Sequence, residues 1–487
     1  WFAGIARLKA NWITRANNRR TRDKGRKKGE HWYCDITAAF GYGPADGLVT
    51  MLYNGKYVGY GIQGCRTPIF RSDHSNYFTI PLGDLGLNTE DHWGGSTGRV
   101  HWGLDPQPVN PQDPAASYPL LFGNDTSNPR YWRVILIEWS QLFLGVNNPQ
   151  RMPNIEVVWA RSPRIPGGWT MDTTIPTDGN GNYIRGVNPV AALLEGLTDT
   201  HTGFARSPDT LDQSTWEGVA SNLSEDKWRI NPVIDSQMTE AAFIDEFLKY
   251  FDGYTYYRNG KLALGRHPDT VTVLVPEDYT ELTDNDFTRS PNLRTSRPDE
   301  TLNEIQVKWT DPFDAQYKEV TKVFDAPINR EARGEPVREN IDLTWKQTEA
   351  DVDSFATKYL GHAAARRQSG KVWIRANRAK NPDGSDFNVG DVVFLDQSVP
   401  QLDHAYRITG ISRPEIGEIQ LELMTERGQY PLAYVAPADL EPDPTLPEVA
   451  PLSGAHFLEL PYEISGFDGR LTLFPLIQRS SGTISGA

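Results

Sequence analysis

The chain has 487 residues, a formal net charge of −14 and two cysteines. This length is too great for one hydrophobic core and predicts about three domains of roughly 150 residues. Two cysteines are too few for a disulfide framework, so we expect folding in a reducing compartment. The overall acidity argues against a general nucleic-acid binder, and no apolar run reaches the ~20 residues of a membrane span.

The first charged feature is a basic run, Arg15–Lys28, with eight basic residues and one acid. Because this run carries +7, the rest of the chain carries −21. Clustered basic residues can bind phosphates, but this run has no interleaved aromatic residues on which bases could stack. We therefore predict a solvated loop or a contact with an acidic neighbouring protein.

Residues 31–60 alternate apolar and polar positions and are predicted to form a hairpin. Its corner is Gly43-Pro44-Ala45-Asp46-Gly47, and Asn54-Gly55 is the preferred pair for a two-residue type I′ turn. The corner lacks the third glycine and the following helix of a dinucleotide-binding loop. Cys34 and Cys65 lie in apolar surroundings and are predicted to be buried free thiols, with a single disulfide as the alternative.

The best candidate for a catalytic group is Glu138, which is predicted to end an apolar strand-like stretch within the run Tyr131–Gly145. Many glycosidases place a carboxylate beside aromatic residues in this way, but they need a second carboxylate about 5–10 Å away. The run is equally a buried strand or helix with one polar side chain. The 14 tryptophans have no regular spacing, which favours core packing and subunit contacts over a sugar-binding face.

Metal-binding patterns are weak in this chain. The nine histidines and two cysteines lack the spacing of a metal site. Asp178, Asn180 and Asn182 alternate as in a calcium loop, but the glycine at the sixth position and the glutamate at the twelfth are missing. An Asn-Gly turn is the better interpretation of this segment. We therefore predict no catalytic, cofactor-binding or metal-binding residues.

The pattern changes from strands to helices near residue 186. Helices are predicted over Asn188–Asp199, with Asn188 as N-cap and Pro189 at the first helical position, and within Ser207–Leu223. A third helix is predicted within Ser236–Phe251, with Ala241, Ile244, Leu248 and Phe251 on one face. A hairpin that turns on Asn259-Gly260 follows. These elements predict a compact α+β insert of roughly 100 residues.

From about residue 300 strands return. Leu302–Pro312 and Tyr317–Asp325 are predicted as paired strands, followed by one long helix that begins with a capping box of Thr348 and Asp351. Three further strand segments follow, at Lys371–Asn377, Asp391–Asp396 and Ala405–Arg427. Residues 434–452 are rich in proline and acidic residues and predict a semi-rigid spacer.

The order of these modules resembles the central hub, or tip, protein of long-tailed phages. This family includes the tip attachment protein of lambda-like siphophages and the hub of gene transfer agents. The resemblance covers about residues 1–435, and the segments that carry it are Tyr33, Gly43-Pro44-x-Asp46-Gly47, Asn54-Gly55-Lys56, the strand start at Arg151, Pro153 and Asn154, the helices and hairpin of 188–265, Leu302–Pro312, the alanine-rich helix, Asn388–Asp396 and Tyr406–Ile411. Some relatives carry iron–sulfur chemistry, which is not transferred to a chain with two cysteines.

The resemblance implies a β-rich, multidomain α+β fold with two tube-forming, β-barrel-like hub domains. The expected segments are 1–170, the first tube-forming domain; 171–285, the α+β insert; 286–433, the second tube-forming domain with one long helix; 434–452, the linker; and 453–487, the start of a C-terminal domain that leads to a fibre. Because the chain begins Trp1-Phe2 without Met and ends before the fibre region of many relatives, a truncated hub is expected.

The implied function is that of a structural, non-enzymatic virion protein at the distal tip, or baseplate, of a non-contractile phage tail, made in the bacterial cytoplasm. Implied partners are two further copies in a homotrimer, the distal tail protein and tail tube proteins, the tape measure protein and a central fibre. The host surface would be contacted indirectly, and DNA would pass through the lumen without specific binding. The alternatives are a module that recognises host polysaccharide through exposed tryptophans and a glycan hydrolase built around Glu138.

Overall fold

The computed structural model describes residues 1–22, 30–58, 69–70, 77–80, 96–103, 133–146, 154–177, 186–267, 279–296, 301–310, 319–327, 330, 335–346, 348–364, 367–398, 401–426, 436–437, 455–459, 473–478 and 484–485. The chain divides into two compact units, Trp1–Ala436 and Pro437–Ala487. The division lies inside the proline-rich segment 434–452, where the sequence predicts a spacer. Each unit is described by itself.

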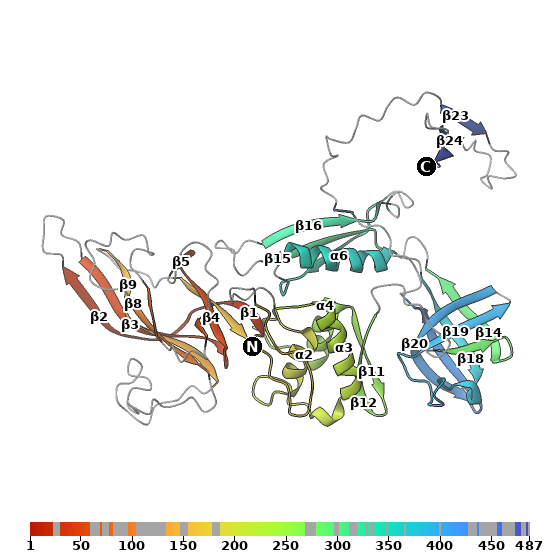
Figure 1. Ribbon diagram of the computed structural model, residues 1–487, viewed down its shortest axis with the longest axis horizontal. Helices are drawn as coiled ribbons and strands as arrows, with labels where there is room; N and C mark the ends of the chain where they lie inside the picture. Colours follow the sequence, from red (N-terminus) through yellow and green to blue (C-terminus); the bar gives the residue numbers. More distant parts are fainter. Residues whose placement is uncertain are drawn as a thin grey trace. The chain divides into compact units, whose positions relative to one another are not determined.

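Two antiparallel sheets form the first part of the larger unit (Figure 1). The strands of sheet A are, in spatial order, β2 (Asn11–Arg22), β3 (Glu30–Tyr42), β9 (Val134–Val146), β8 (Ser96–Trp102) and β7 (Tyr77–Ile80). Sheet B contains β1 (Gly4–Lys9), β10 (Ile155–Arg161), β4 (Gly47–Tyr53) and β5 (Lys56–Val58), and β6 (Ile69–Phe70) also pairs with β4. One apolar cluster joins residues of both sheets, with Trp139 from sheet A and Trp159 from sheet B fully buried.

The predicted hairpin over residues 31–60 is wrong in its first half. Strand β3 pairs with β2 and β9, whereas β4 pairs with β10 and β5, so residues 43–46 carry the chain from one sheet to the other. A hairpin arm and a strand that crosses between packed sheets have the same alternation, so the sequence pattern did not distinguish them. The second half is confirmed: β4 and β5 pair across Asn54 and Gly55, whose φ values are +50° and +77°.

The connection at Gly43–Asp46 is anchored to both sheets. The amide of Gly43 donates to the carbonyl of Arg133 at 2.6 Å, and the amide of Ala45 donates to the carbonyl of Trp102 at 2.9 Å. The amide of Asp46 donates to Ala160 in sheet B at 2.8 Å. These bonds satisfy three backbone N–H groups at the point where the chain leaves the strand pairing of sheet A. The segment is therefore a corner, as predicted, but between two sheets.

Three helices and a hairpin follow. They are α2 (Pro189–Thr198), α3 (Gln213–Glu225), α4 (Glu240–Phe251) and the β11–β12 pair (Gly253–Arg258 and Lys261–Arg266), with a short 3-10 turn η5 at Pro208–Thr210. The predicted start of α2 is confirmed, because the Asn188 side chain accepts a hydrogen bond from the Val190 amide and Pro189 is the first helical residue. The hairpin turns at Asn259 and Gly260, both with positive φ, as predicted.

The buried face of α4 differs from the predicted one. Phe243, Phe247 and Tyr250 are buried together with Ile244 and Phe251, whereas Ala241 is exposed. The helix is rotated toward its aromatic side chains because each of them removes far more apolar surface from water than an alanine.

The next element group is a small sheet covered by one helix. Its strands are β17 (Arg338–Asp342), β15 (Glu304–Thr310) and β16 (Glu319–Asp325), with β15 parallel to β17 and antiparallel to β16. Helix α6 (Glu349–Ala364) contacts β15 and β16. Its predicted capping box is confirmed, since the Thr348 hydroxyl accepts from the Asp351 amide at 3.2 Å and donates to the Asp351 carboxylate at 2.7 Å.

A six-stranded curled sheet completes the larger unit. Its order is β13 (Thr280–Thr283), β19 (Val392–Ser398), β20 (Gln401–Glu415), β21 (Glu418–Thr425), β18 (Gln368–Arg375) and β14 (Phe287–Thr295). The two-residue strand β22 (Ala436–Pro437) follows later in the chain and pairs with β16 of the small sheet. The outermost strands β13 and β14 are joined by a tight turn in which the Asp286 side chain accepts from the Thr283 amide. A separate apolar cluster, including Leu395, Tyr406 and Leu421, lies among these strands.

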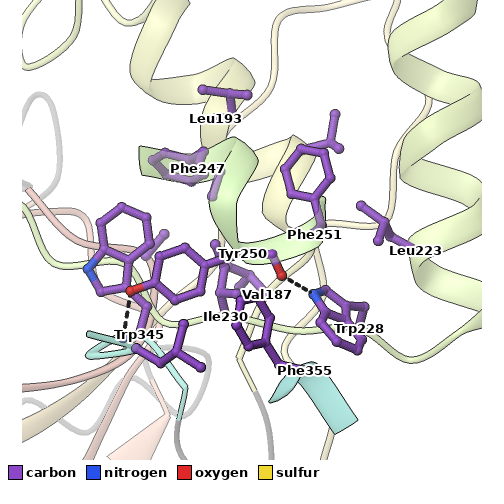
Figure 2. Packing of buried hydrophobic residues seen from close by; sticks show 14 of the residues in the cluster. Val187, Leu193, Leu223, Trp228, Ile230, Phe247, Tyr250, Phe251, Trp345 and Phe355 are labelled. Atoms are coloured by element: carbon purple, nitrogen blue, oxygen red, sulfur yellow. Dashed lines mark hydrogen bonds between the residues drawn. The ribbon is translucent and has the colours of Figure 1, made fainter. Parts of the chain in front are cut away.

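The largest core joins sheet B, the helices and the β15–α6 group. Figure 2 shows its centre, where Tyr250 of α4 stacks on Trp345 with ring centroids 4.7 Å apart. The Trp228 indole donates to the Tyr250 carbonyl at 2.7 Å, and the Tyr250 hydroxyl accepts from the Trp345 amide at 3.3 Å. The helical segment therefore shares one core with the strands on either side of it in sequence.

The smaller unit contains a three-stranded antiparallel sheet. Its strands are β23 (Ala455–Glu459), β24 (Leu473–Gln478) and β25 (Ile484–Ser485). Taken together, the chain is a β-rich multidomain α+β protein, as the sequence predicted.

Candidate functional site

Glu138, the predicted catalytic candidate, lies in the interior of β9, the central strand of sheet A, and not at a strand end. The strand continues through Trp139 to Val146, because the residues after Glu138 still fit a pleated sheet. The Glu138 side chain is buried, and its Oε2 lies 3.0 Å from Nε2 of His101 on β8. Sequence reasoning did not identify His101, since only the pairing of β8 with β9 brings the two side chains together.

This arrangement does not have the geometry of a glycosidase pair. Such a pair needs two carboxylates on either side of an open substrate site, whereas Glu138 is 2% exposed and contacts an imidazole. Its Oε1 atom and the nearby Thr37 hydroxyl have no hydrogen-bond partner within the described part of the chain. The pair is therefore a buried polar contact between adjacent strands.

The other sequence candidates have varied outcomes. Cys34 is fully buried in β3, while Cys65 and the Asn-Gly turn at 178–183 lie outside the described residues. Arg15–Arg22 of the basic run belong to the edge strand β2, so the predicted loop is wrong there, and Asp23–Lys28 lie outside the described residues. The alternative, a contact with an acidic neighbouring protein, stays a prediction. The tryptophans pack in cores as predicted, at Trp102, Trp139, Trp159, Trp216, Trp228, Trp309 and Trp345.

Neither a metal-binding cluster nor a membrane-spanning helix occurs among the residues that the structure describes. Within them, no group of three or more His, Cys, Asp or Glu side chains could hold a metal ion. No described helix has both the length and the apolar composition needed to cross a membrane.

Several buried charged side chains meet at joints between element groups. At the first joint, Arg161 at the end of β10 binds Glu195 of α2 through two hydrogen bonds of 2.9 and 2.5 Å. Arg161 also donates to the carbonyl of Phe2 at 2.7 Å. Both charged side chains are almost fully buried. Burial raises the pKa of Glu195, and the adjacent Arg161 guanidinium opposes that rise.

The second joint lies between the β11–β12 hairpin and the curled sheet. Arg407 of β20 donates to the Tyr254 hydroxyl at 2.5 Å and to the carbonyl of Gly390 at 2.6 Å. It also forms an ion pair of 2.7 Å with the buried carboxylate of Glu426. Burial raises the pKa of Tyr254 to about 12. One guanidinium therefore links a hairpin, a loop and a strand end.

His267 follows β12 and lies beside the second joint, with its ring 4.8 Å from the Tyr254 ring. Burial lowers the pKa of His267 to about 3, and the nearby cations Arg407 and Arg367 and the ring of His362 act in the same direction. A buried base among cations stays neutral over the physiological range.

The third joint connects α6 to the segment between α3 and α4 that contains Trp228. The Lys346 ammonium is buried 3.8 Å from the centroid of the Trp228 ring, and the Lys358 ammonium of α6 is 4.9 Å from the same centroid. Lys346 also donates to the carbonyl of Arg229 at 3.2 Å. Contacts of cations with an aromatic face are directional and strengthen when water is excluded.

These three joints are suited to holding element groups in a fixed orientation. Directional, buried charge contacts tolerate few alternative orientations, so they align the element groups that they connect. The sequence carried little signal for them, because an isolated arginine or lysine near a strand end is usually a solvated residue.

Comparisons with known proteins place the fold. No family model matches the chain, and no curated protein matches it. The structure is similar to a chain from the virion of a native gene transfer agent particle, with a TM-score of 0.55 and 16% identity over 90% of this chain and 86% of that chain. At this identity the likeness shows a shared fold.

Two further solved structures are more distant. A tail protein from Neisseria meningitidis MC58 has a TM-score of 0.32 and 9% identity over 69% of this chain and 90% of its own. The 43 kDa tail protein of prophage MuSo2 from Shewanella oneidensis has a TM-score of 0.27 and 11% identity over 42% of this chain and 56% of its own. Similarity at this level carries no argument about this chain.

Proposed function

We propose that this chain is a structural protein of a phage-type tail, and specifically the central hub at the distal tip of a long non-contractile tail. The observation that carries the proposal is the fold shared with a chain of a gene transfer agent virion over nearly the full length of both chains. The module order that resembles tail hubs in the sequence supports the same assignment.

The internal organisation also suits a scaffold. Two β-rich groups, sheets A and B and the curled sheet, are joined through helices by buried charge contacts at Arg161–Glu195 and Arg407–Tyr254. In the proposed hub, residues 1–170 and 286–433 are the two tube-forming domains, 171–285 is the insert, 434–452 is a linker and 453–487 begins the part that leads to a fibre. Rigid joints would hold both tube-forming domains at a constant angle within each subunit.

The proposed assembly is a homotrimer that closes the tail tube. Two related domains in each of three subunits would match a sixfold tube above, with the distal tail, tube and tape measure proteins as neighbours and a central fibre below. The net charge of −14 suits a channel through which DNA passes without binding. Its location would be the virion, with no enzymatic role.

Mass photometry of the purified chain tests the copy number. The proposal predicts particles of three times the 54.7 kDa chain at high protein concentration, in equilibrium with single chains on dilution. Particles that contain two or four copies would contradict a trimeric hub.

A further inference from the structure

Two Asn-Gly pairs form the tips of hairpins that have the same backbone geometry. The φ values of Asn54 and Gly55 are +50° and +77°. Those of Asn259 and Gly260 are +53° and +77°. Each pair is the exposed two-residue loop of its hairpin, β4–β5 in the first case and β11–β12 in the second. Sequence and turn type are therefore matched between the two sites.

An asparagine followed by glycine allows the side-chain amide to react with the main chain. When the Gly260 amide nitrogen attacks Cγ of Asn259, a nitrogen–Cγ bond forms, the Cγ–Nδ2 bond breaks, and ammonia leaves with the amide proton. The product is a five-membered cyclic imide. Glycine permits this approach because it has no Cβ, and no atom lies within 4 Å of the place that a Cβ at Gly260 would occupy.

Water then opens the imide ring in one of two ways. Addition at the former side-chain carbonyl gives aspartate, whereas addition at the main-chain carbonyl gives isoaspartate, in which the chain continues through Cβ and Cγ. In both cases one amide nitrogen is released as ammonia and one oxygen is taken from water. Both steps need access to solvent, and the turn at Asn259 and Gly260 is exposed.

The side chain of Asn54 is anchored to a neighbouring chain segment. Its Oδ1 accepts a hydrogen bond from the Asn154 amide at 2.8 Å, and the Asn54 amide donates to the Asn154 carbonyl at 2.7 Å. Attack on Cγ requires the carboxamide to turn, which breaks the first of these bonds. The loss of one such bond slows the reaction by about two- to tenfold.

The side chain of Asn259 has no such anchor. Within the described part of the chain, no hydrogen bond holds its carboxamide. Its hairpin is a sheet of two strands, whereas the strand before Asn54 lies in the interior of sheet B. A turn at the end of a two-stranded sheet opens more readily, so the Asn259 side chain reaches the geometry of attack more often.

We propose that Asn259 is a site of spontaneous covalent modification, at which water converts the asparagine through the cyclic imide into aspartate and isoaspartate, while Asn54 is protected. Isoaspartate adds one main-chain atom to a two-residue loop, which displaces the pairing of Arg258 with Lys261. Both products add one negative charge to a chain of net charge −14. The site does not depend on the proposed hub function.

Peptide mapping by mass spectrometry tests the site, with the folded full chain incubated at mildly alkaline pH and sampled over time. The peptide that contains Asn259 should gain the mass of an NH2-to-OH exchange about two- to tenfold faster than the peptide that contains Asn54. Digestion in mildly acidic buffer keeps the reaction slow during the measurement. A third pair, Asn180-Gly181, lies outside the described residues and is read from a separate peptide.

Two controls accompany this measurement. In guanidinium chloride the Asn154 contact is lost, so the rates at Asn54 and Asn259 should agree within about twofold. Asn259→Asp keeps a residue that tolerates positive φ but has no amide to lose, so its peptide shows no mass gain. The same variant gives the retention time of the aspartate product, which separates it from isoaspartate.

The order of the two rates decides the outcome. Modification of Asn54 that is as fast as that of Asn259 in the folded chain overturns the inference. A difference that persists unchanged in guanidinium chloride also overturns it, because the flanking sequence would then set the order. A folded chain in which Asn259 stays unmodified, while the unfolded chain reacts, shows that the turn protects this asparagine and overturns the site.

Discussion

At the scale of single residues, the larger unit depends on charged groups that water does not reach. Arg161 and Glu195 are 2% and 3% exposed, and the pair joins a strand to a helix. A buried pair contributes modestly compared with an apolar substitute, but removal of one partner leaves an uncompensated charge. The joint between β10 and α2 should therefore tolerate few substitutions at Arg161 or Glu195.

Arg161→Met tests this joint. The variant leaves Glu195 buried without its cation, so we expect a loss of about 3–5 kcal/mol in the free energy of unfolding. Lys371→Met is the matched control: its partner Glu422 and Lys371 itself are both 48% exposed, and the loss should be below about 1 kcal/mol. Urea denaturation of both variants measures the difference, and equal midpoints would refute the role of Arg161.

Burial of His267 should make the free energy of unfolding depend on pH. Its pKa is about 3 in the folded chain against 6.5 for the free side chain. Between these values the unfolded chain binds the extra proton, so stability is complete above pH 6.5 and declines as pH falls toward 3. The slope from this residue is at most about 1.4 kcal/mol per pH unit.

His267→Gln removes this contribution. The native chain should lose more unfolding free energy than His267→Gln when the pH falls from 7 to 4. Urea denaturation at a series of pH values measures it, and carboxylates titrate alike in both proteins, so they cancel. Parallel pH profiles would show that His267 is not a buried neutral base.

Glu138 separates the structural account from the hydrolase alternative. Its burial in the central strand of sheet A predicts that neither the native chain nor Glu138→Gln releases soluble fragments from peptidoglycan or capsular polysaccharide. A dye-release assay on both substrates makes this measurement. Cleavage by the native chain that Glu138→Gln abolishes would restore the enzyme interpretation.

At the scale of elements, the sequence predicted local structure better than strand pairing. The Asn188 and Thr348 caps and the turn at Asn259-Gly260 were predictable because each is decided by neighbouring residues. The crossing at Gly43–Asp46 was not predictable, because a strand that passes from one sheet to another shows the same local alternation as a hairpin arm. The joints were not predictable either, because Arg161 and Glu195 meet only after the tertiary fold forms.

Gly43→Ala tests the crossing between sheets. A Cβ atom at this position would lie 2.6 Å from the Trp102 carbonyl oxygen and 2.9 Å from the Gly103 Cα, both backbone atoms that cannot move away separately. We expect a loss of about 1–3 kcal/mol. Gly167→Ala is the control, since no atom lies within 4 Å of its Cβ position. Thermal unfolding compares them, and an equal midpoint would show that the close approach is absent in solution.

At the scale of the whole molecule, the proposed hub function concerns assembly. The net charge of −14 makes single copies repel one another, so a contact between copies needs local charge complementarity or buried apolar surface. The chain shares its fold with a chain of a gene transfer agent virion. The central claim is therefore about what several copies build.

Electron microscopy of the purified chain, at a concentration high enough for assembly, tests that claim most directly. The account predicts class averages of a three-lobed ring with a central opening. Particles of a single copy, or particles with twofold symmetry and no central opening, would contradict it.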